Sequence, residues 1–298
     1  MEPTRIPANF GPGVLGERQF SGYLHGIESL PHSADGNSMF LAEPQPTGFD
    51  LRFQIFGFPV RVHPAFFLMP LILGGSLLQG DNPGSTGVNF LVLTAVFFVA
   101  ILVHELGHAF AMRYFGESAS IVLYWMGGLA IPNMGRWNAG RARPRTPYSQ
   151  LIISAAGPLA GILLGLVLVA VLVAMGGKIV WETVLVFPIP MPDLRATAFA
   201  DNQAMWVLMT SGMFSCFFWN LLNLAPVLPL DGGRILQSIL TIFDPWNGTR
   251  TCLVVSMITA GALALLSLSN NAQFGAFFFG FMAFESFQAL QSYGGGRR

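Results

Sequence analysis

Two histidines that flank a glutamate form the clearest chemical pattern in this sequence, His104-Glu105-Leu-Gly-His108. Residues four apart on a helix share one face, so both imidazoles can reach a single metal ion. Glu105 lies beside them, where it can take a proton from water at that metal. The alternative is a pair of core histidines whose hydrogen bonds are satisfied within the protein. Because ionisable groups inside apolar helices are costly and usually functional, we favour the metal interpretation.

Two histidines leave a catalytic zinc site incomplete, since such a site usually takes three protein ligands and keeps one open position. His63 is a weak candidate, because it lies at the entry of an apolar segment, where histidines commonly have no metal role. Asp231 is the stronger candidate, in Asn223-Leu-Ala-Pro-Val-Leu-Pro-Leu-Asp231-Gly-Gly-Arg234. The prolines end a helix, and the two glycines predict a tight turn at the aspartate. Asp-Gly is, however, also a common turn pair without any metal role.

The composition excludes a soluble globular protein. Hydrophobic residues make up 53% of the 298 residues and charged residues only 10%, whereas soluble domains carry about 25% charged residues. The mean hydropathy of +0.57 and the 27 phenylalanines agree with this. The apolar residues are concentrated in runs, which also excludes a disordered chain. With zero net charge and no basic tract, the sequence predicts no nucleic-acid partner.

Six apolar segments predict a multi-pass protein, since a membrane-spanning helix needs about 20 apolar residues. They are residues 64–78, 88–111, 151–175, 203–224, 252–268 and 274–290. Lysine and arginine collect on the cytoplasmic side of membrane proteins. If the N-terminus lies inside, only Lys178 and Arg195 of the 15 basic residues lie outside, and 13 lie inside. We therefore predict a cell-membrane protein in the lipid bilayer, with both termini cytoplasmic and with His104, His108 and Asp231 at the cytoplasmic side.

The segments between the spans predict a simple organisation. Residues 1–50 are rich in Pro, Gly, Ser and Asn and predict a mobile cytoplasmic tail, followed by a membrane domain over residues 51–292 and a short tail over 293–298. Two short β-hairpins are predicted at the membrane surface. The first pairs residues 51–56 with 60–63, and the second pairs 121–126 with 129–131 around a turn at Gly127-Gly128. The first 50 residues do not predict a signal peptide. Cys216 and Cys252 do not predict a disulfide.

Together these motifs resemble the site-2 protease family of intramembrane zinc metalloproteases. Further matches are Phe56-Gly-Phe-Pro-Val-Arg-Val-His63, Gly127-Gly128 and Ala156-Gly-Pro158, so the resemblance extends over roughly residues 50 to 240. It implies one Zn²⁺ per chain with His104, His108 and Asp231 as ligands, and Glu105 as the catalytic base. The implied fold is an all-α polytopic membrane protein, whose six transmembrane helices include a three-helix zinc-protease core (about residues 88–235) beside the short hairpins. The implied substrates are membrane proteins, such as membrane-tethered regulators.

The sequence departs from the family at one position. Many members carry an asparagine three residues after the Gly-Pro of the third span, and this chain has Gly161 there. Asn220 and Asn223 are the candidates for a replacement donor to the oxyanion. Glu285, in the sixth span, either lines a hydrated entrance to the site or extends to the cytoplasmic surface, and we favour the second. We find no segment long enough for a PDZ or CBS domain, which indicates a compact form.

A second class of function is open at this point: a metal-binding membrane scaffold or transporter without proteolytic activity. A transporter should carry polar or ionisable groups along a path through several helices. The outer halves of the second and fourth spans are apolar instead, so an endopeptidase is the preferred interpretation. Replacing Glu105 with Gln separates the two, because a protease would lose turnover and keep its zinc.

Overall fold

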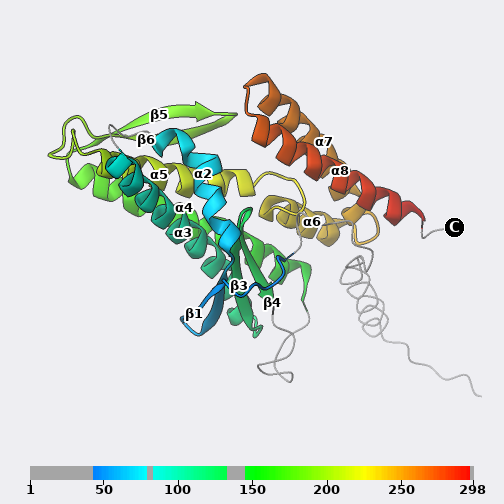
Figure 1. Ribbon diagram of the computed structural model, residues 1–298. Coiled ribbons are helices and arrows are strands. Elements are labelled where there is room, and N and C mark those ends of the chain that lie inside the picture. The colour runs from blue at the N-terminus through cyan, green and yellow to red at the C-terminus, as the bar shows by residue number, and fades with distance from the viewer. Residues whose placement is uncertain (1–42, 79–82, 133–144, 296–298) are drawn as a thin grey trace, which may run out of the picture. The chain divides into compact units, whose positions relative to one another are not determined.

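The structure, a computed structural model, describes residues 43–78, 83–132 and 145–295, and these form a mostly helical fold with two small sheets (Figure 1). The helices are η1 (Pro64–Phe67), α2 (Leu68–Gly74), η2 (Gly75–Leu78), α3 (Pro83–Tyr114), α4 (Pro147–Ala174), α5 (Gln203–Asn223), α6 (Asp231–Phe243), α7 (Gly248–Ser269) and α8 (Gln273–Gly295). The strands are β1 (Leu51–Ile55), β2 (Phe58–Val62), β3 (Ala119–Tyr124), β4 (Gly127–Pro132), β5 (Lys178–Val184) and β6 (Phe187–Asp193). Most of the predicted N-terminal tail lies outside the described residues, and α8 continues into the predicted C-terminal tail.

Among the described residues, four helices are long and apolar enough to cross a membrane: α3, α4, α5 and α7. They coincide with the second to fifth predicted spans. The predicted first span is divided into η1, α2 and η2, with an apolar helical stretch of only residues 64–74. His63 begins this segment by accepting a hydrogen bond at Nδ1 from the N–H of Ala65, 3.1 Å away. The predicted sixth span lies in α8, which has 23 residues but is not among the four.

The two predicted hairpins form, and they join into one sheet. β1 pairs with β2 and β3 with β4, both antiparallel, while β2 pairs with β3 in parallel, giving the order β1-β2-β3-β4. The turn between β3 and β4 is Trp125-Met126, so the prediction of a turn at Gly127-Gly128 is wrong. The glycines serve close packing instead, because a Cβ at Gly127 would collide with Trp219 and one at Gly128 with Glu105.

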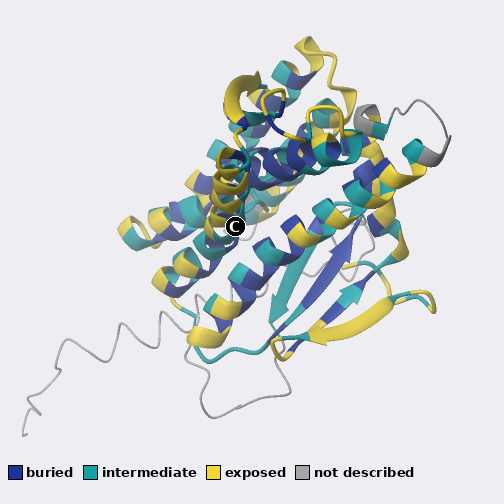
Figure 2. Ribbon diagram, turned by 90° about the vertical axis from the view of Figure 1, so that its left-hand side faces the viewer, coloured by how far each residue is buried: buried dark blue, intermediate teal, exposed yellow. Residues whose placement is uncertain are grey.

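The sheet packs against the C-terminal half of α3. Its burial increases from the exposed β1 to the buried β3 (Figure 2). Arg113 fixes the first hairpin to the end of α3, because its Nη2 donates to the carbonyl of Phe56 at 2.7 Å. The same guanidinium lies 3.6 Å above the centre of the Phe58 ring, a favourable cation–π distance. The sheet is therefore attached directly to the helix that carries both histidines.

A row of glycines lets α4 pack closely against its neighbours. Gly157, Gly161 and Gly165 recur every four residues and so lie on one face of the helix. A Cβ at these positions would collide with His108, with Asn220, and with Phe217 and Cys216, respectively. Small residues at this spacing allow membrane helices to approach closely. The spacing is visible in the sequence, but the side chains that fill it come from other helices.

The β5–β6 hairpin was not predicted from the sequence. Its second strand, Phe-Pro-Ile-Pro-Met-Pro-Asp, carries a proline at every second position, which argues against a central strand. The hairpin has only two strands, so these prolines can face an edge that needs no donors. Ile189 is fully buried against a cluster that includes Phe218 and Leu222 of α5. Tertiary packing on α5 therefore stabilises a hairpin that local propensity disfavours.

Candidate metal centre

Three side chains converge between α3 and α6. The Nε2 atoms of His104 and His108 lie 3.1 Å apart, and they lie 3.1 and 3.3 Å, respectively, from Oδ2 of Asp231. Both histidines are buried, and the Asp231 side chain is 13% exposed. These are the three residues that the sequence predicted as ligands, and as a group they could bind one metal ion.

Asp231 is placed by a helix that the sequence motifs did not predict. It is the first residue of α6, not a residue of a turn. Gly232 and Gly233 are needed for close packing and not for a turn. A Cβ on Gly232 would collide with the backbone of Leu224, and one on Gly233 with the backbone of Val227, just after α5. The glycine pair therefore lets α6 start directly against the end of α5. Burial alone would raise the pKa of Asp231, but His108 and His104 lower it below its usual range.

Hydrogen bonds set which nitrogen of each imidazole faces the ligand group. Nδ1 of His108 lies 2.7 Å from the carbonyl oxygen of Ile153, which can only accept, so this Nδ1 carries the proton. Nδ1 of His104 lies 2.7 Å from Oδ1 of Asn220. Asn220 donates its own Nδ2 to the carbonyl of Cys216 at 2.7 Å, so its oxygen faces the histidine and Nδ1 of His104 donates as well. Both Nε2 lone pairs are left free for a metal.

This donor set fits zinc. Two lone pairs and a carboxylate oxygen repel one another at 3.1 to 3.3 Å unless a cation or a proton lies among them. Ligand atoms of a tetrahedral zinc ion, each about 2.0–2.2 Å from the metal, are roughly 3.3–3.6 Å apart, close to the distances observed here. The two nitrogens and one carboxylate oxygen are also the ligand types of catalytic zinc sites that keep a fourth position open. The chemistry and the spacing of the three atoms therefore agree with one zinc ion.

Glu105 lies beside this group and is held by the sheet. Its side chain is buried, and the N–H of Ala130 on β4 donates to its carboxylate. Gly128, also on β4, has no side chain that would occupy the same space. Tyr124 is close enough for the charge of Glu105 to contribute, after burial, to raising the pKa of Tyr124 to about 12. No signal in the sequence predicts these contacts to the second hairpin.

The other candidate residues lie elsewhere. His63 caps η1 and Glu285 lies on α8, and neither belongs to the ligand group. Asn223 donates Nδ2 to the carbonyl of Trp219 at 3.0 Å. Asn220, one of the two candidates for an oxyanion donor, uses both ends of its amide within the protein.

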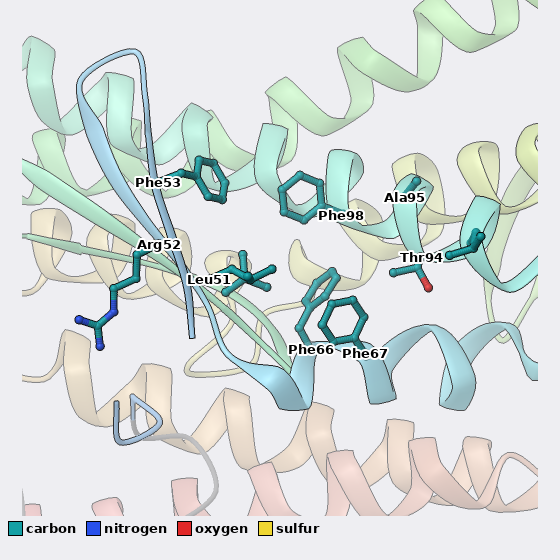
Figure 3. Close-up of a pocket in the computed structure, with 10 residues that line it drawn as sticks. Leu51, Arg52, Phe53, Phe66, Phe67, Thr94, Ala95 and Phe98 are labelled. Carbon is teal, nitrogen blue, oxygen red and sulfur yellow. The ribbon is translucent and has the colours of Figure 1, made fainter. Parts of the chain in front are cut away.

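A cavity of about 450 Å³ lies away from this centre, between the first hairpin, η1 and α3 (Figure 3). It is lined mostly by apolar side chains, including Phe53, Phe66 and Phe98, and none of the predicted site residues lines it. We therefore assign no chemistry to it.

Comparison with known proteins identifies the family of this chain. Residues 92–266 match peptidase family M50, more than half of the chain. This chain belongs to peptidase family M50, the site-2 protease family. The resemblance predicted from the motifs is thereby confirmed.

Several known proteins are similar to this chain. A candidate zinc metalloprotease of Synechocystis sp. is 30% identical over 239 residues, which cover 75% of this chain and 54% of the relative. The zinc metalloprotease MJ0392 of Methanocaldococcus jannaschii is 27% identical over 194 residues, 63% of this chain and 44% of the relative. The chain thus spans about half the length of the curated relatives it matches. The solved site-2 protease of M. jannaschii aligns over 81% of this chain and 95% of its own, with 23% identity and a TM-score of 0.48.

Proposed function

We propose that this family M50 member is a zinc-dependent intramembrane endopeptidase. It would hydrolyse peptide bonds in membrane-spanning or membrane-adjacent segments of other membrane proteins, near the cytoplasmic face. The observation that carries the proposal is the convergence of two imidazole nitrogens and one carboxylate oxygen beside a buried glutamate. The charge distribution supports the orientation, with both termini cytoplasmic and all six predicted segments in the cell membrane.

His104, His108 and Asp231 would hold the ion, and Glu105 would move the proton. A zinc ion supplies Lewis-acid polarisation of the scissile carbonyl and a nucleophilic water near neutral pH. Glu105 takes a proton from the attacking water and delivers it to the departing amine. The N–H of Ala130 keeps the carboxylate oriented for both transfers. Burial excludes bulk water from the reacting atoms, which strengthens each of these electrostatic effects.

The substrate must lose its helical hydrogen bonds before attack, because a helical peptide hides its carbonyls. In the order β1-β2-β3-β4, β4 is an edge strand, and it also contacts Glu105 through Ala130. An extended segment can pair with such an edge through its backbone. We propose that an unwound substrate segment lies along β4 and that this places its carbonyl beside Glu105.

Zinc stoichiometry of the purified chain tests this function first. We expect about one zinc per native chain, loss of zinc in Asp231→Ala, and full zinc in Glu105→Gln. In the same preparations, cleavage of single-span membrane peptides with helix-breaking residues in their cytoplasmic half should fall at least 10³-fold for Glu105→Gln. A well-folded native chain without zinc would overturn the protease assignment. Undiminished cleavage by Glu105→Gln would show that another residue moves the proton.

A further inference from the structure

Among the described residues, Asn220 makes the only side-chain contact with Nδ1 of His104, the ring nitrogen that does not face the ligand group. The two residues are 116 positions apart, on α5 and α3, and their side chains are 1% and 3% exposed. At 2.7 Å, the Nδ1–H of His104 donates to Oδ1 of Asn220. The nitrogen of the same amide is also hydrogen-bonded, because Nδ2 of Asn220 donates to the carbonyl of Cys216 one turn earlier. The amide therefore cannot rotate without losing a buried hydrogen bond.

The space for this amide is left by Gly161. A Cβ on Gly161 would collide with the nitrogen, the oxygen and the carbon of the Asn220 amide. Position 161 has no side chain, and the amide of Asn220 from the facing helix fills the space that this leaves. Gly161 and Asn220 are therefore complementary, since a side chain at position 161 would overlap the amide of Asn220.

We propose that Asn220 is the positioning residue for His104, and that Gly161 and Asn220 act as one coupled pair. Asn220 fixes the Nδ1–H tautomer and the ring orientation, which directs Nε2 into the ligand group. His108 needs no such side chain, because a backbone carbonyl, that of Ile153, serves it. Asn220 is then not the oxyanion donor that the sequence suggested. Its only donor group, Nδ2, already bonds to the carbonyl of Cys216. This proposal rests on the proposed function, because it concerns the same metal site.

Zinc affinity of the full chain, measured by competition with a chromogenic chelator, tests the proposal without any substrate. Asn220→Leu keeps the number and branching of the side-chain heavy atoms and removes the acceptor, and we expect roughly 10- to 100-fold weaker zinc binding. Asn220→Asp keeps an acceptor oxygen and should retain the native affinity. Asn223→Leu is the matched control for zinc binding, since among the described residues the amide of Asn223, on the same helix, bonds to the carbonyl of Trp219 and not to a histidine. The visible spectrum of the Co²⁺-loaded protein should change in Asn220→Leu and not in the control.

A double-mutant cycle tests the coupling. Gly161→Ala should displace the amide and weaken zinc binding as Asn220→Ala does. The double variant should be no weaker than the poorer single variant, because both changes remove the same hydrogen bond. Additive losses would overturn the coupled pair. Native zinc affinity in a folded Asn220→Leu, or an equal loss in Asn220→Asp and Asn220→Leu, would overturn the positioning role.

The two proposals fail in distinguishable ways. If the native chain binds no zinc, the protease assignment and the role of Asn220 are both overturned. If the native chain binds zinc and cleaves membrane peptides while Asn220→Leu binds zinc equally well, only the inference on Asn220 fails. If Asn220→Leu does not fold, the comparison of Gly161→Ala with Asn220→Asp decides the question.

Discussion

Each histidine of the ligand group depends on one hydrogen-bond acceptor and on one glycine. His108 has the carbonyl of Ile153 behind it and Gly157 against its ring, and His104 has Asn220, which in turn occupies the space over Gly161. An imidazole that can rotate or change tautomer loses affinity for its metal. The lack of a side chain at Gly157 and Gly161 of α4 is therefore as important to the ligand group as the three residues that form it.

Gly157→Ala tests this at the scale of a single residue. The new Cβ would collide with the His108 ring, so either the ring or α4 must move. We expect zinc affinity to fall by about 10-fold or more. Gly261→Ala on α7 is the control, because no atom lies within 4 Å of the new Cβ. The control should bind zinc normally. Equal zinc affinity in both variants would contradict the argument.

At the scale of elements, the small sheet contacts the glutamate beside the ligand group. β4 supplies the N–H that orients Glu105 and, at Gly128, the space that Glu105 fills. β3 is paired on both sides, with β2 and with β4, and so has no edge to offer. Within the described sheet, only β4 has a free edge next to the glutamate.

Gly128→Ala should therefore uncouple catalysis from metal binding. Its Cβ would lie 2.6 Å from Cδ of Glu105, which forces the carboxylate away from Ala130. We expect turnover to fall about 10²-fold, as for other displacements of a catalytic group by about 1 Å. The zinc content, measured on the same sample, should stay at the native value because the ligands are on α3 and α6. Native turnover in this variant would show that β4 does not hold the catalytic glutamate.

The whole molecule must place its ligand group at one side of the membrane. Four described helices could span it: α3, α4, α5 and α7. If α3, α4 and α5 each cross the membrane once, the C-terminal ends of α3 and α5 lie on the same side. The 13-to-2 distribution of basic residues predicts that this side is the cytoplasm.

Cysteine labelling tests this orientation. The two natural cysteines are buried, so an introduced, exposed cysteine would react selectively with a membrane-impermeant maleimide. Trp181 on β5 and Trp246 between α6 and α7 are 67% and 63% exposed. We expect Trp181→Cys to label on intact cells and Trp246→Cys only after permeabilisation. The reverse pattern would invert the proposed topology and place the site outside.

The sequence by itself determined the chemistry of this protein and much of its framework. Spacing of four on a helix brings His104 and His108 onto one face, and apolar runs of sufficient length define the four long apolar helices. Alternation of apolar and polar residues predicted the first hairpin at nearly its observed position. A glycine pair between two short apolar runs predicted the second, although its turn is Trp125-Met126 and not Gly127-Gly128. These features depend on residues close together in the chain, where local geometry is fixed by bond rotation and hydrogen bonding.

The tertiary structure alone decided what surrounds the ligands. Contacts such as His104 with Asn220 or Glu105 with Ala130 join residues far apart in sequence. Their distances depend on how closely the helices and the sheet pack, and no local periodicity encodes that closeness. The same holds for α6, which starts at Asp231 because two glycines let it lie against the end of α5, and for the joining of two hairpins into one sheet. A glycine in a sequence does not reveal which distant side chain will fill the space that it leaves.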